Sequence, residues 1–314
     1  MNEFDLIKTF FNASQLNFPS EFIEHSIGDD CAVLNVPATH ELCLSVDTLI
    51  EDVHFPAGAK AYDIGTRSLC VTLSDLAAMG AKPIGFTLAI SLPIALKENT
   101  DWLAGFCDGL ASIAQRYDCP LIGGDTTKSP VLTISVQVHG ICEKGKSLKR
   151  SGAQVGDQVC VTATQDRGLG DGAGALSHVL SDPVSGNPLT KAFWKPLPQI
   201  EIGQSLIGVA TSCIDVSDGL IQDLNHICQR SQVAMRLDPM ALPLSGNLLS
   251  NYSQEEALGF ALNGGDDYQL AFTLPAGVSL ANNVVCIGEV IISDHHSVQI
   301  PMLPSIKSTG FNHF

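Results

Sequence analysis

At 314 residues the chain is long enough for two domains, because a single hydrophobic core seldom serves more than about 250–300 residues. It is strongly acidic: 17 Lys and Arg residues face 33 Asp and Glu residues, which gives a net charge of −16 at pH 7. With 45% hydrophobic and 16% charged residues, the composition indicates a folded globular protein and excludes a disordered one. So few basic residues exclude a broad surface for nucleic acid or for an anionic membrane.

The start of the chain and its cysteines indicate a reducing compartment. The first twenty residues contain Glu3 and Asp5 and do not have the basic start and apolar run of a signal peptide. The longest apolar tract, residues 83–96, is too short to span a bilayer and predicts buried sheet. The 10 cysteines are scattered without a Cys-x-x-Cys pair. We therefore expect a cytoplasmic protein with reduced, mostly buried thiols.

Hydrophobic periodicity predicts alternating strands and helices along the chain. Apolar residues recur every second position over residues 86–91 and 132–139, which predicts two half-buried strands. An apolar stripe predicts a helix over residues 101–117, and helices are also expected at 171–180 and 217–230. This order predicts an α/β (α+β) fold. The turn-rich stretch 143–157 divides the chain, and we expect two domains, residues 1–146 and 147–314.

The carboxylates gather in six short motifs flanked by glycine or serine. They are Gly28-Asp29-Asp30, Ser45-Val46-Asp47-Thr48, Ser74-Asp75, Gly123-Gly124-Asp125-Thr126-Thr127, Asp215-Val216-Ser217-Asp218-Gly219 and Gly264-Gly265-Asp266-Asp267. Most follow an apolar run, so we expect them where a strand ends or a helix begins, which is where open α/β sheets bind ligands. Period-two geometry places Ser45 and Asp47 together on one face of a strand.

A single Asp in such a motif is more often a helix cap or a turn residue. Six motifs in which Asp dominates are harder to explain as caps alone. Carboxylates brought together raise one another's pKa and need a counter-charge, and this sequence has few Lys and Arg. Isolated carboxylates and hydroxyls suit Mg²⁺, which bridges protein oxygens to phosphates. The sequence therefore predicts a site that binds a polyphosphate through several Mg²⁺ ions.

Two glycine-rich segments resemble phosphate-binding loops. Residues 140–147 match the P-loop pattern G-x-x-x-x-G-K-S, but the sequence after Ser147 predicts a second strand instead of the helix that a P-loop requires. We interpret the match as coincidental. Residues 168–174 lack the spacing of a dinucleotide-binding loop, and we interpret them as a tight or mobile turn.

The motifs together resemble the thiamine-monophosphate kinase family. The segments that carry the resemblance are IGDDCAVL, SVDTLIEDVHF, VTLSDLAAMGAKPIGFTLAISLP, LIGGDTTKSP, LKRSGAQVGD, CIDVSDGLIQDL and GGDDYQLAFT. The family lies in a superfamily with aminoimidazole ribonucleotide synthetase, selenophosphate synthetase and a hydrogenase maturation protein. The resemblance implies a two-domain aminoimidazole ribonucleotide synthetase-like fold. Its N-terminal domain binds ATP and Mg²⁺ and pairs its sheet in a homodimer, and its C-terminal α/β domain covers nucleotide and substrate.

The resemblance also implies roles for particular residues. Those similar to Mg²⁺ ligands are Asp30, Ser45, Asp47, Asp75, Asp125, Asp215 and Asp218. Those similar to ATP contacts are Gly124, Asp125, Arg150 and Ser217. Those similar to contacts of thiamine monophosphate are His54, Asp266 and Phe311. Three places depart from the family: Asp266 stands where a Glu is usual, and Cys107 stands where an aromatic residue is frequent. The third is residues 195–199, Lys-Pro-Leu-Pro-Gln, where the family has Arg-Pro-x-Pro-Arg.

The residues leave some of these assignments open. His54 is as readily a half-buried structural histidine, Phe311 an anchor of the C-terminal tail, and Arg150 part of a solvated basic turn. We interpret Asp29 and Asp52 as capping or supporting groups.

The resemblance implies ATP-dependent phosphorylation of thiamine monophosphate. Because the acceptor is already an ionised phosphate, we expect direct in-line transfer without a general base. One alternative is an ATP-using synthetase of the same superfamily, such as one that makes selenophosphate. That reaction would want a reactive N-terminal Cys, and the first cysteine here is Cys31, inside the segment IGDDCAVL that carries the Gly28-Asp29-Asp30 motif. A non-catalytic maturation protein is the other alternative, and the retained aspartates argue against it.

Overall fold

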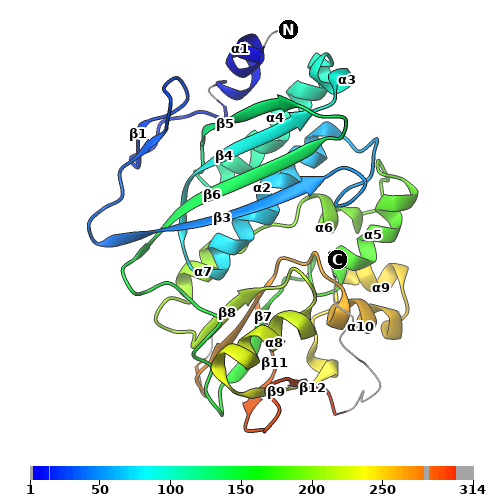
Figure 1. The fold of residues 1–314 in the computed structure, drawn as a ribbon. Coiled ribbons are helices and arrows are strands. Elements are labelled where there is room, and N and C mark those ends of the chain that lie inside the picture. The colour runs from blue at the N-terminus through cyan, green and yellow to red at the C-terminus, as the bar shows by residue number, and fades with distance from the viewer. Residues whose placement is uncertain (1–2, 14, 279–282, 302–314) are drawn as a thin grey trace. The chain divides into compact units, whose positions relative to one another are not determined.

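The computed structural model describes residues 3–13, 15–278 and 283–301, and the chain forms two compact units. The first unit comprises residues 1–76, 81–145 and 180–184, and the second comprises residues 77–80, 146–179 and 185–314. The chain passes from the first unit to the second at Gly145 and Lys146, within the turn-rich stretch. Helices and strands alternate in both, so the predicted mixed α/β class is confirmed (Figure 1).

The first unit is built on a four-stranded sheet with the strand order β3-β6-β4-β5. Strands β3, β6 and β4 pair antiparallel, and β5 runs parallel to β4. The elements of this unit, the last residues of α2 being counted with the second, are α1 (Glu3–Leu6), η1 (Ile7–Phe11), β1 (Ile23–His25), β2 (Val33–Leu34), β3 (His40–Ile50), α2 (Ala61–Ala78), β4 (Lys82–Leu92), α3 (Ile94–Lys97), α4 (Thr100–Arg116), β5 (Leu121–Lys128) and β6 (Thr133–Glu143).

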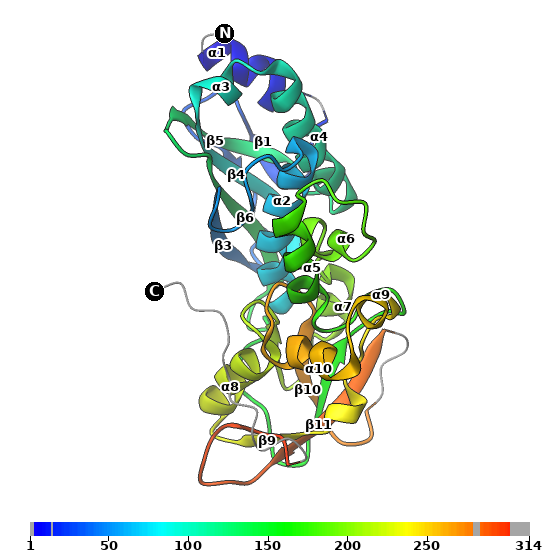
Figure 2. The ribbon, with the colours of Figure 1, turned by 90° about the vertical axis from the view of Figure 1, so that its right-hand side faces the viewer.

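Helices α2 and α4 cover one face of this sheet (Figure 2). They approach closely because each presents a glycine to the other's backbone: a Cβ on Gly65 would lie 2.2 Å from Phe106 O, and one on Gly109 would lie 2.1 Å from Tyr62 O. Helix α4 begins where Asn99 Oδ1 accepts a hydrogen bond from the Trp102 amide at 3.0 Å. The predicted helix over residues 101–117 and the two predicted strands are therefore confirmed, with β4 and β6 longer than predicted.

The opposite face of the sheet is unusual because it exposes apolar side chains. Leu42, Leu44 and Val46 of β3 are 41%, 53% and 59% exposed, whereas Ser45 and Asp47 point towards the helices. The predicted alternation along β3 is correct, but the polar side chains are the ones that face the packed side of the sheet.

The second unit contains a six-stranded sheet with the order β12-β9-β11-β7-β10-β8. All its pairs are antiparallel except β12 with β9. Its elements, the last residues of α5 being counted with the first unit, are β7 (Gln158–Thr162), α5 (Asp171–Ser181), α6 (Thr190–Trp194), α7 (Ile200–Ser205), β8 (Ser212–Asp215), α8 (Leu220–Ser231), β9 (Ala234–Leu237), η2 (Pro239–Ala241), α9 (Gly246–Asn251), α10 (Gln254–Asn263), β10 (Leu270–Leu274), β11 (Val284–Ile291) and β12 (Val298–Gln299).

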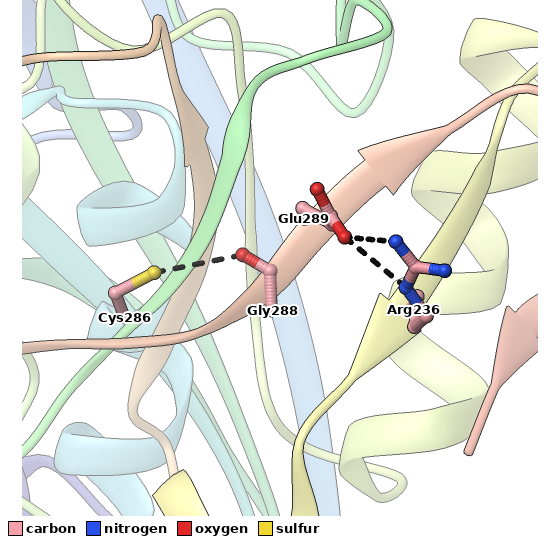
Figure 3. A network of polar contacts seen from close by, with 4 residues as sticks. All are labelled: Arg236, Cys286, Gly288 and Glu289. Carbon is pink, nitrogen blue, oxygen red and sulfur yellow. Dashed lines mark hydrogen bonds and ion pairs between the residues drawn. The ribbon is translucent and has the colours of Figure 1, made fainter. Parts of the chain in front are cut away.

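A bulge shifts the register of β11 between Cys286 and Gly288, and Figure 3 shows how polar contacts accompany it. Cys286 Sγ donates a hydrogen bond to Gly288 O at 3.5 Å, and Arg236 of β9 pairs with Glu289 of β11. Because this ion pair is about half exposed, it contributes at most about 1 kcal/mol to stability. The pairing of β9 with β11 is instead stabilised by burial, since Met235, Leu237 and Val290 lie in the core of this unit.

All ten cysteines lie in the described residues, and all are free thiols. Seven of them are buried and only Cys31 and Cys286 are exposed, as the sequence predicted. Burial and the nearby Asp108 raise the pKa of Cys107, in α4, to about 12, so this thiol stays neutral. In the part of the chain that the structure describes, no helix combines the length and the apolar character that a membrane span needs.

Candidate functional site

In the first unit, β3 and α2 bring two predicted metal ligands together. Asp47 is on the helix-facing side of β3, and Asp75 is near the end of α2. Ser45 precedes Asp47 by two residues on the same face of β3. Its Oγ donates a hydrogen bond to Asp75 Oδ2. The sequence predicted that most of these motifs lie at strand ends or helix starts, and this is wrong for both residues. Asp47 lies within β3 and Asp75 lies in the last turn of α2.

The two carboxylates disturb each other's ionisation. Burial and, to a lesser extent, the negative charge of Asp75 raise the pKa of Asp47 to about 6, although a hydrogen bond from Thr72 lowers it slightly. The ionised pair is therefore unfavourable in the folded protein. A cation beside it would lower the pKa of Asp47, because an opposite charge favours the ionised form.

The other predicted ligands of this unit lie elsewhere. Asp30 is exposed in the loop between β1 and β2, and Asp125 is exposed on β5. Pairing across the sheet places Asp47 in one row with Val136, Leu88 and Gly124, so that two strands separate β3 from β5. At the usual strand spacing this separation is about 14 Å. Among the described residues, no three His, Cys, Asp or Glu side chains form a group that could hold a metal ion.

Gly124, which precedes Asp125, approaches β4 so closely that only glycine fits. Its φ is +158°, and a Cβ there would lie 1.9 Å from Leu88 O. The backbone therefore meets its neighbouring strand directly before Asp125, and no side chain stands at this point of the sheet.

His54 lies in the turn after β3, and a backbone contact fixes its orientation. The Ile50 amide donates a hydrogen bond to His54 Nδ1 at 3.0 Å. With Nδ1 as acceptor, the neutral ring carries its proton on Nε2. Asp52, in the same turn, accepts a hydrogen bond from the Ala57 amide at 3.0 Å, as expected of a capping residue.

In the second unit, the loop between β8 and α8 carries three of the predicted residues. Asp215 ends β8 and is buried, and Ser217 and Asp218 are half-buried. Asp223, in the first turn of α8, accepts hydrogen bonds on Oδ2 from the amides of Ser217, Asp218 and Gly219 at 3.0, 3.1 and 3.2 Å. The sequence analysis missed Asp223, although an acidic residue in the first turn after Asp-Gly is a signal for such capping.

A second loop, residues 264–268, lies beside the first. The Asp266 amide donates to Ser217 O at 2.9 Å, and the Tyr268 amide donates to Val216 O at 2.8 Å. Asp266 and Tyr268 have left-handed backbones, with φ of +66° and +51°, which cost about 1 kcal/mol or more each in non-glycine residues. This strained loop presents the half-buried Asp266, the predicted substrate contact.

The glycine-rich turn at 168–174 packs against this second loop. Asp267 is buried and accepts hydrogen bonds from the amides of Gly170 at 2.6 Å and Gly172 at 3.0 Å. A Cβ on Gly172 would lie 2.3 Å from Asp266 O. Of the two readings left open, a tight turn agrees with these contacts. The sequence analysis missed the role of Asp267.

The P-loop-like run, residues 140–147, spans the passage from the first unit to the second, and Arg150 follows it in the second unit. The run continues from β6 through a turn into an irregular segment, and no helix follows Ser147, as predicted. Arg150 is exposed, and its carbonyl accepts a hydrogen bond from Ser231 Oγ at 3.3 Å. Phe311 lies outside the described residues.

This fold and these acidic motifs define a protein of the AIR synthase class. Residues 28–142 match the family model of AIR synthase related protein, N-terminal domain. Thiamine-monophosphate kinase of Haemophilus influenzae is 42% identical over 282 residues, covering 88% of this chain and 82% of the relative. That of Salmonella typhimurium is 38% identical and covers 99% and 98%. The chain therefore belongs to the thiamine-monophosphate kinase family.

Solved structures agree with this assignment. Thiamine-monophosphate kinase from Stenotrophomonas maltophilia K279a superposes with a TM-score of 0.84 at 37% identity, over 96% of this chain and 97% of that one. AaThiL complexed with AMPPCP and TMP gives a TM-score of 0.80 at 30% identity, over 94% and 93%. Hydrogenase maturation protein HypE in complex with ATP, at 18% identity and a TM-score of 0.73, shares the fold alone. The predicted fold class, family and enzyme class, a kinase, are confirmed.

Proposed function

We propose that this chain phosphorylates thiamine monophosphate to thiamine diphosphate with ATP, by direct in-line transfer assisted by several Mg²⁺ ions. The observation that carries the proposal is the likeness over 94% of the chain to AaThiL, a relative solved with AMPPCP and TMP. Both reactants of the proposed reaction are thus of the kind that this relative binds, AMPPCP being an ATP analogue. The aspartates of the six motifs supply ligands for the Mg²⁺ ions that would neutralise two phosphate groups.

The donor set of the first unit fits Mg²⁺. Ser45, Asp47 and Asp75 offer only hard oxygen atoms, and the ionised Asp47 is destabilised by burial and by the charge of Asp75. Bound there, Mg²⁺ supplies charge neutralisation for phosphate oxygens. Two protein carboxylates would suffice to hold the ion, because Mg²⁺ in proteins usually keeps several ligands that the protein does not supply. We assign Asp30, Asp125, Asp215 and Asp218 as further Mg²⁺ ligands.

The remaining predicted residues are assigned to the two substrates. Gly124, Arg150 and Ser217, with Asp125, contact ATP. His54 offers an Nε2 proton, and Asp266 offers a carboxylate, to thiamine monophosphate. Phe311, outside the described residues, completes the acceptor site. Because the acceptor phosphate is ionised at pH 7, these groups hold and orient the reactants, and none of them needs to remove a proton.

The exposed apolar face of the first sheet supports a homodimer. Leu42, Leu44 and Val46 form a stripe on β3, and His139 of β6 pairs directly with Leu44 on the same face. A soluble protein gains free energy when such a stripe is covered, and two copies can cover it mutually through a two-fold axis. We propose that the first unit is the dimerisation domain of a cytoplasmic homodimer.

One assay tests the reaction. Purified protein is incubated with ATP, Mg²⁺ and thiamine monophosphate, and thiamine diphosphate is measured by chromatography. We expect product that depends on Mg²⁺ and disappears with excess chelator. Absence of product, while a known kinase works in parallel, would overturn the proposal. Rapid quenching with labelled ATP tests the direct transfer, which predicts no labelled protein at any time.

Light scattering after size exclusion tests the dimer. We expect Leu44→Lys to produce a monomer, because it places a charge within the apolar stripe. Ile292→Lys is the matched control, since Ile292 is 86% exposed but lies in the second unit. A wild-type protein that elutes as a monomer, or a control that dissociates equally, contradicts this assignment.

A further inference from the structure

Two buried carboxylates of the second unit lie outside the predicted ligand set. Asp223 and Asp267 are 2% and 6% exposed, and both use their oxygens to accept backbone hydrogen bonds. Buried acidic side chains are costly unless their hydrogen bonds offset the lost hydration. Asp223 bonds loop 215–219 and Asp267 lies in loop 264–268, so both support loops that carry predicted site residues.

One carboxylate oxygen of Asp223 accepts hydrogen bonds from three consecutive amides. Its Oδ2 accepts from Ser217, Asp218 and Gly219, all within 3.2 Å. Successive amides that converge on one point form a nest, which favours a negative charge at its centre. The bonds therefore fix the backbone directly before α8, and with it the side chains of Ser217 and Asp218.

Both carboxylate oxygens of Asp267 accept hydrogen bonds from backbone amides. Oδ2 accepts from Gly170 at 2.6 Å, and Oδ1 accepts from Gly172 at 3.0 Å. Its neighbours Asp266 and Tyr268 are bonded through their own amides to Ser217 O and Val216 O. Asp267 thus connects loop 264–268 to loop 168–172, and the two backbone bonds connect loop 264–268 to loop 215–219. Asp223 fixes loop 215–219 to the first turn of α8.

Neighbouring charges do not stabilise the ionised forms of these two carboxylates. Burial and, to a lesser extent, the charge of Asp218 raise the pKa of Asp223 to about 7, although its three amide hydrogen bonds act in the opposite direction. Burial raises the pKa of Asp267 well above its usual range, and its charged neighbours Asp171 and Asp266 act in the same direction. The amides are the favourable partners of both groups.

We propose that Asp223 and Asp267 are positioning residues of the phosphoryl-transfer site. Asp223 holds Ser217 and Asp218 in place for the nucleotide and its metal ion, and Asp267 holds Asp266 in place for the acceptor. The inference rests on the proposed function for the substrates, but the connection of the loops is a property of the chain itself.

The geometry gives opposite expectations for the same substitution at the two positions. Asp223→Asn retains an oxygen that can accept all three amides, because only Oδ2 is used. Asp267→Asn must present an NH₂ group to Gly170 or Gly172, because both oxygens are used. Asparagine therefore replaces aspartate at 223 and cannot replace it at 267.

Hydrogen exchange on the ligand-free protein tests the connection without activity. In Asp223→Ala the amides of 217–219 should exchange at least about tenfold faster than in wild type, because they lose their acceptor. Asp223→Asn should restore wild-type exchange. In Asp267→Asn the amides of 170 and 172 should exchange faster by a similar factor. If Asp223→Ala does not fold, Asp223→Leu, which fills a similar volume, replaces it.

Steady-state kinetics test the positioning. Asp223→Ala should raise KM for ATP at least about fivefold and leave KM for thiamine monophosphate within about twofold, and Asp267→Asn should do the reverse. Thr162→Val is the matched structural control. It removes buried hydrogen bonds to Gln269 and the Leu270 amide in the same unit without touching the three loops. It should lower the melting temperature and leave both KM values unchanged.

The outcomes separate the two levels of the proposal. An Asp223→Asn variant as impaired as Asp223→Ala would show that the charge, and not the acceptor, is required, and would overturn the assignment. Unchanged KM values in Asp223→Ala and Asp267→Asn, with losses like those of Thr162→Val, would reduce both residues to structural ones. A wild-type protein without kinase activity would overturn the proposed function, while hydrogen exchange would still decide whether the loops are connected.

Discussion

Tyr268 donates a hydrogen bond from its phenol oxygen to Asp266 Oδ1 at 3.0 Å, although only one residue separates them in the chain. The contact is possible because both residues have positive φ values, which turn their side chains towards each other. One of the two carboxylate oxygens of Asp266 is therefore oriented by a neighbour within the same loop. The proposed acceptor site depends on this orientation.

Removing the phenol should weaken acceptor binding. Tyr268→Phe keeps the ring and deletes the donor, so Asp266 loses a bond worth about 1–2 kcal/mol to a charged acceptor. We expect KM for thiamine monophosphate to rise about three- to tenfold, with KM for ATP unchanged. Initial rates over a range of both substrates measure this. Tyr62→Phe, in the other unit, is the control, and equal effects of both substitutions would argue against the contact.

Lengthening Asp266 restores the residue that the family usually carries. Glu adds one methylene and moves the carboxylate about 1.5 Å further from the strained loop. We expect Asp266→Glu to leave KM for thiamine monophosphate within about twofold or to lower it. Titration of the purified variant with the acceptor, followed by calorimetry, gives the affinity directly. A sharp loss of affinity would mean that the site is built around the shorter side chain.

Substitution of Asp47 should change both the rate of catalysis and the stability of the fold. Asp47→Asn should lower kcat by at least about 100-fold, because it removes a charged metal ligand, and should leave the fold intact. In chelator the same variant should be more stable than wild type at pH 7.5, since the repulsion with Asp75 is gone. Wild-type turnover in this variant would show that the proposed metal site is misplaced. Asp101→Asn, at the exposed start of α4, is the control.

The pH dependence of that stabilisation follows from the direction of the pKa shift. The pKa of Asp47 rises from 3.8 to about 6 on folding, so the folded state binds the proton more tightly. Ionised Asp47 destabilises the fold above pH 6, and the penalty is relieved as the pH falls from about 6 to about 4. The advantage of Asp47→Asn should shrink over this range, and thermal melts in chelator at several pH values measure it.

Much of the fold was predictable because its signals are local. The apolar stripe of α4 and the alternation in β4 and β6 depend only on the spacing of residues within one element. The start of α8 was placed three residues too early, because Gly219 takes a φ of +126° and the helix begins after it at Leu220. Alternation in β3 correctly grouped Ser45 with Asp47, but it could not tell which face the helices cover.

The site was less predictable because its relationships are long-range. The pairing of Asp47 with Asp75 depends on which helix packs under β3. The separation of Asp47 from Asp125 depends on the strand order, which places β6 and β4 between them. Asp223 and Asp267 were missed because their roles depend on burial and on the amides of glycine-containing loops.

His139 yields a prediction about acid stability. Burial lowers its pKa, and neither ring nitrogen has a hydrogen-bond partner in the described part of the chain. The unfolded state therefore binds a proton more readily than the folded state, and stability is lost as the pH falls below about 6.5, the ordinary pKa of His. His139→Phe removes both the proton-binding group and the unpartnered nitrogens, so it should raise the melting temperature by about 2–4 °C at neutral pH.

The gain from His139→Phe should widen as the pH is lowered from 7.5 to 5.5, because only the wild type then acquires the proton on unfolding. Calorimetric melts at four or five pH values measure the difference. Gln137→Leu is the matched control, since Gln137 lies on the same face of β6 and does not titrate, and its effect should be the same at every pH. A gain that stays constant or shrinks towards pH 5.5 would show that His139 is charged in the folded protein.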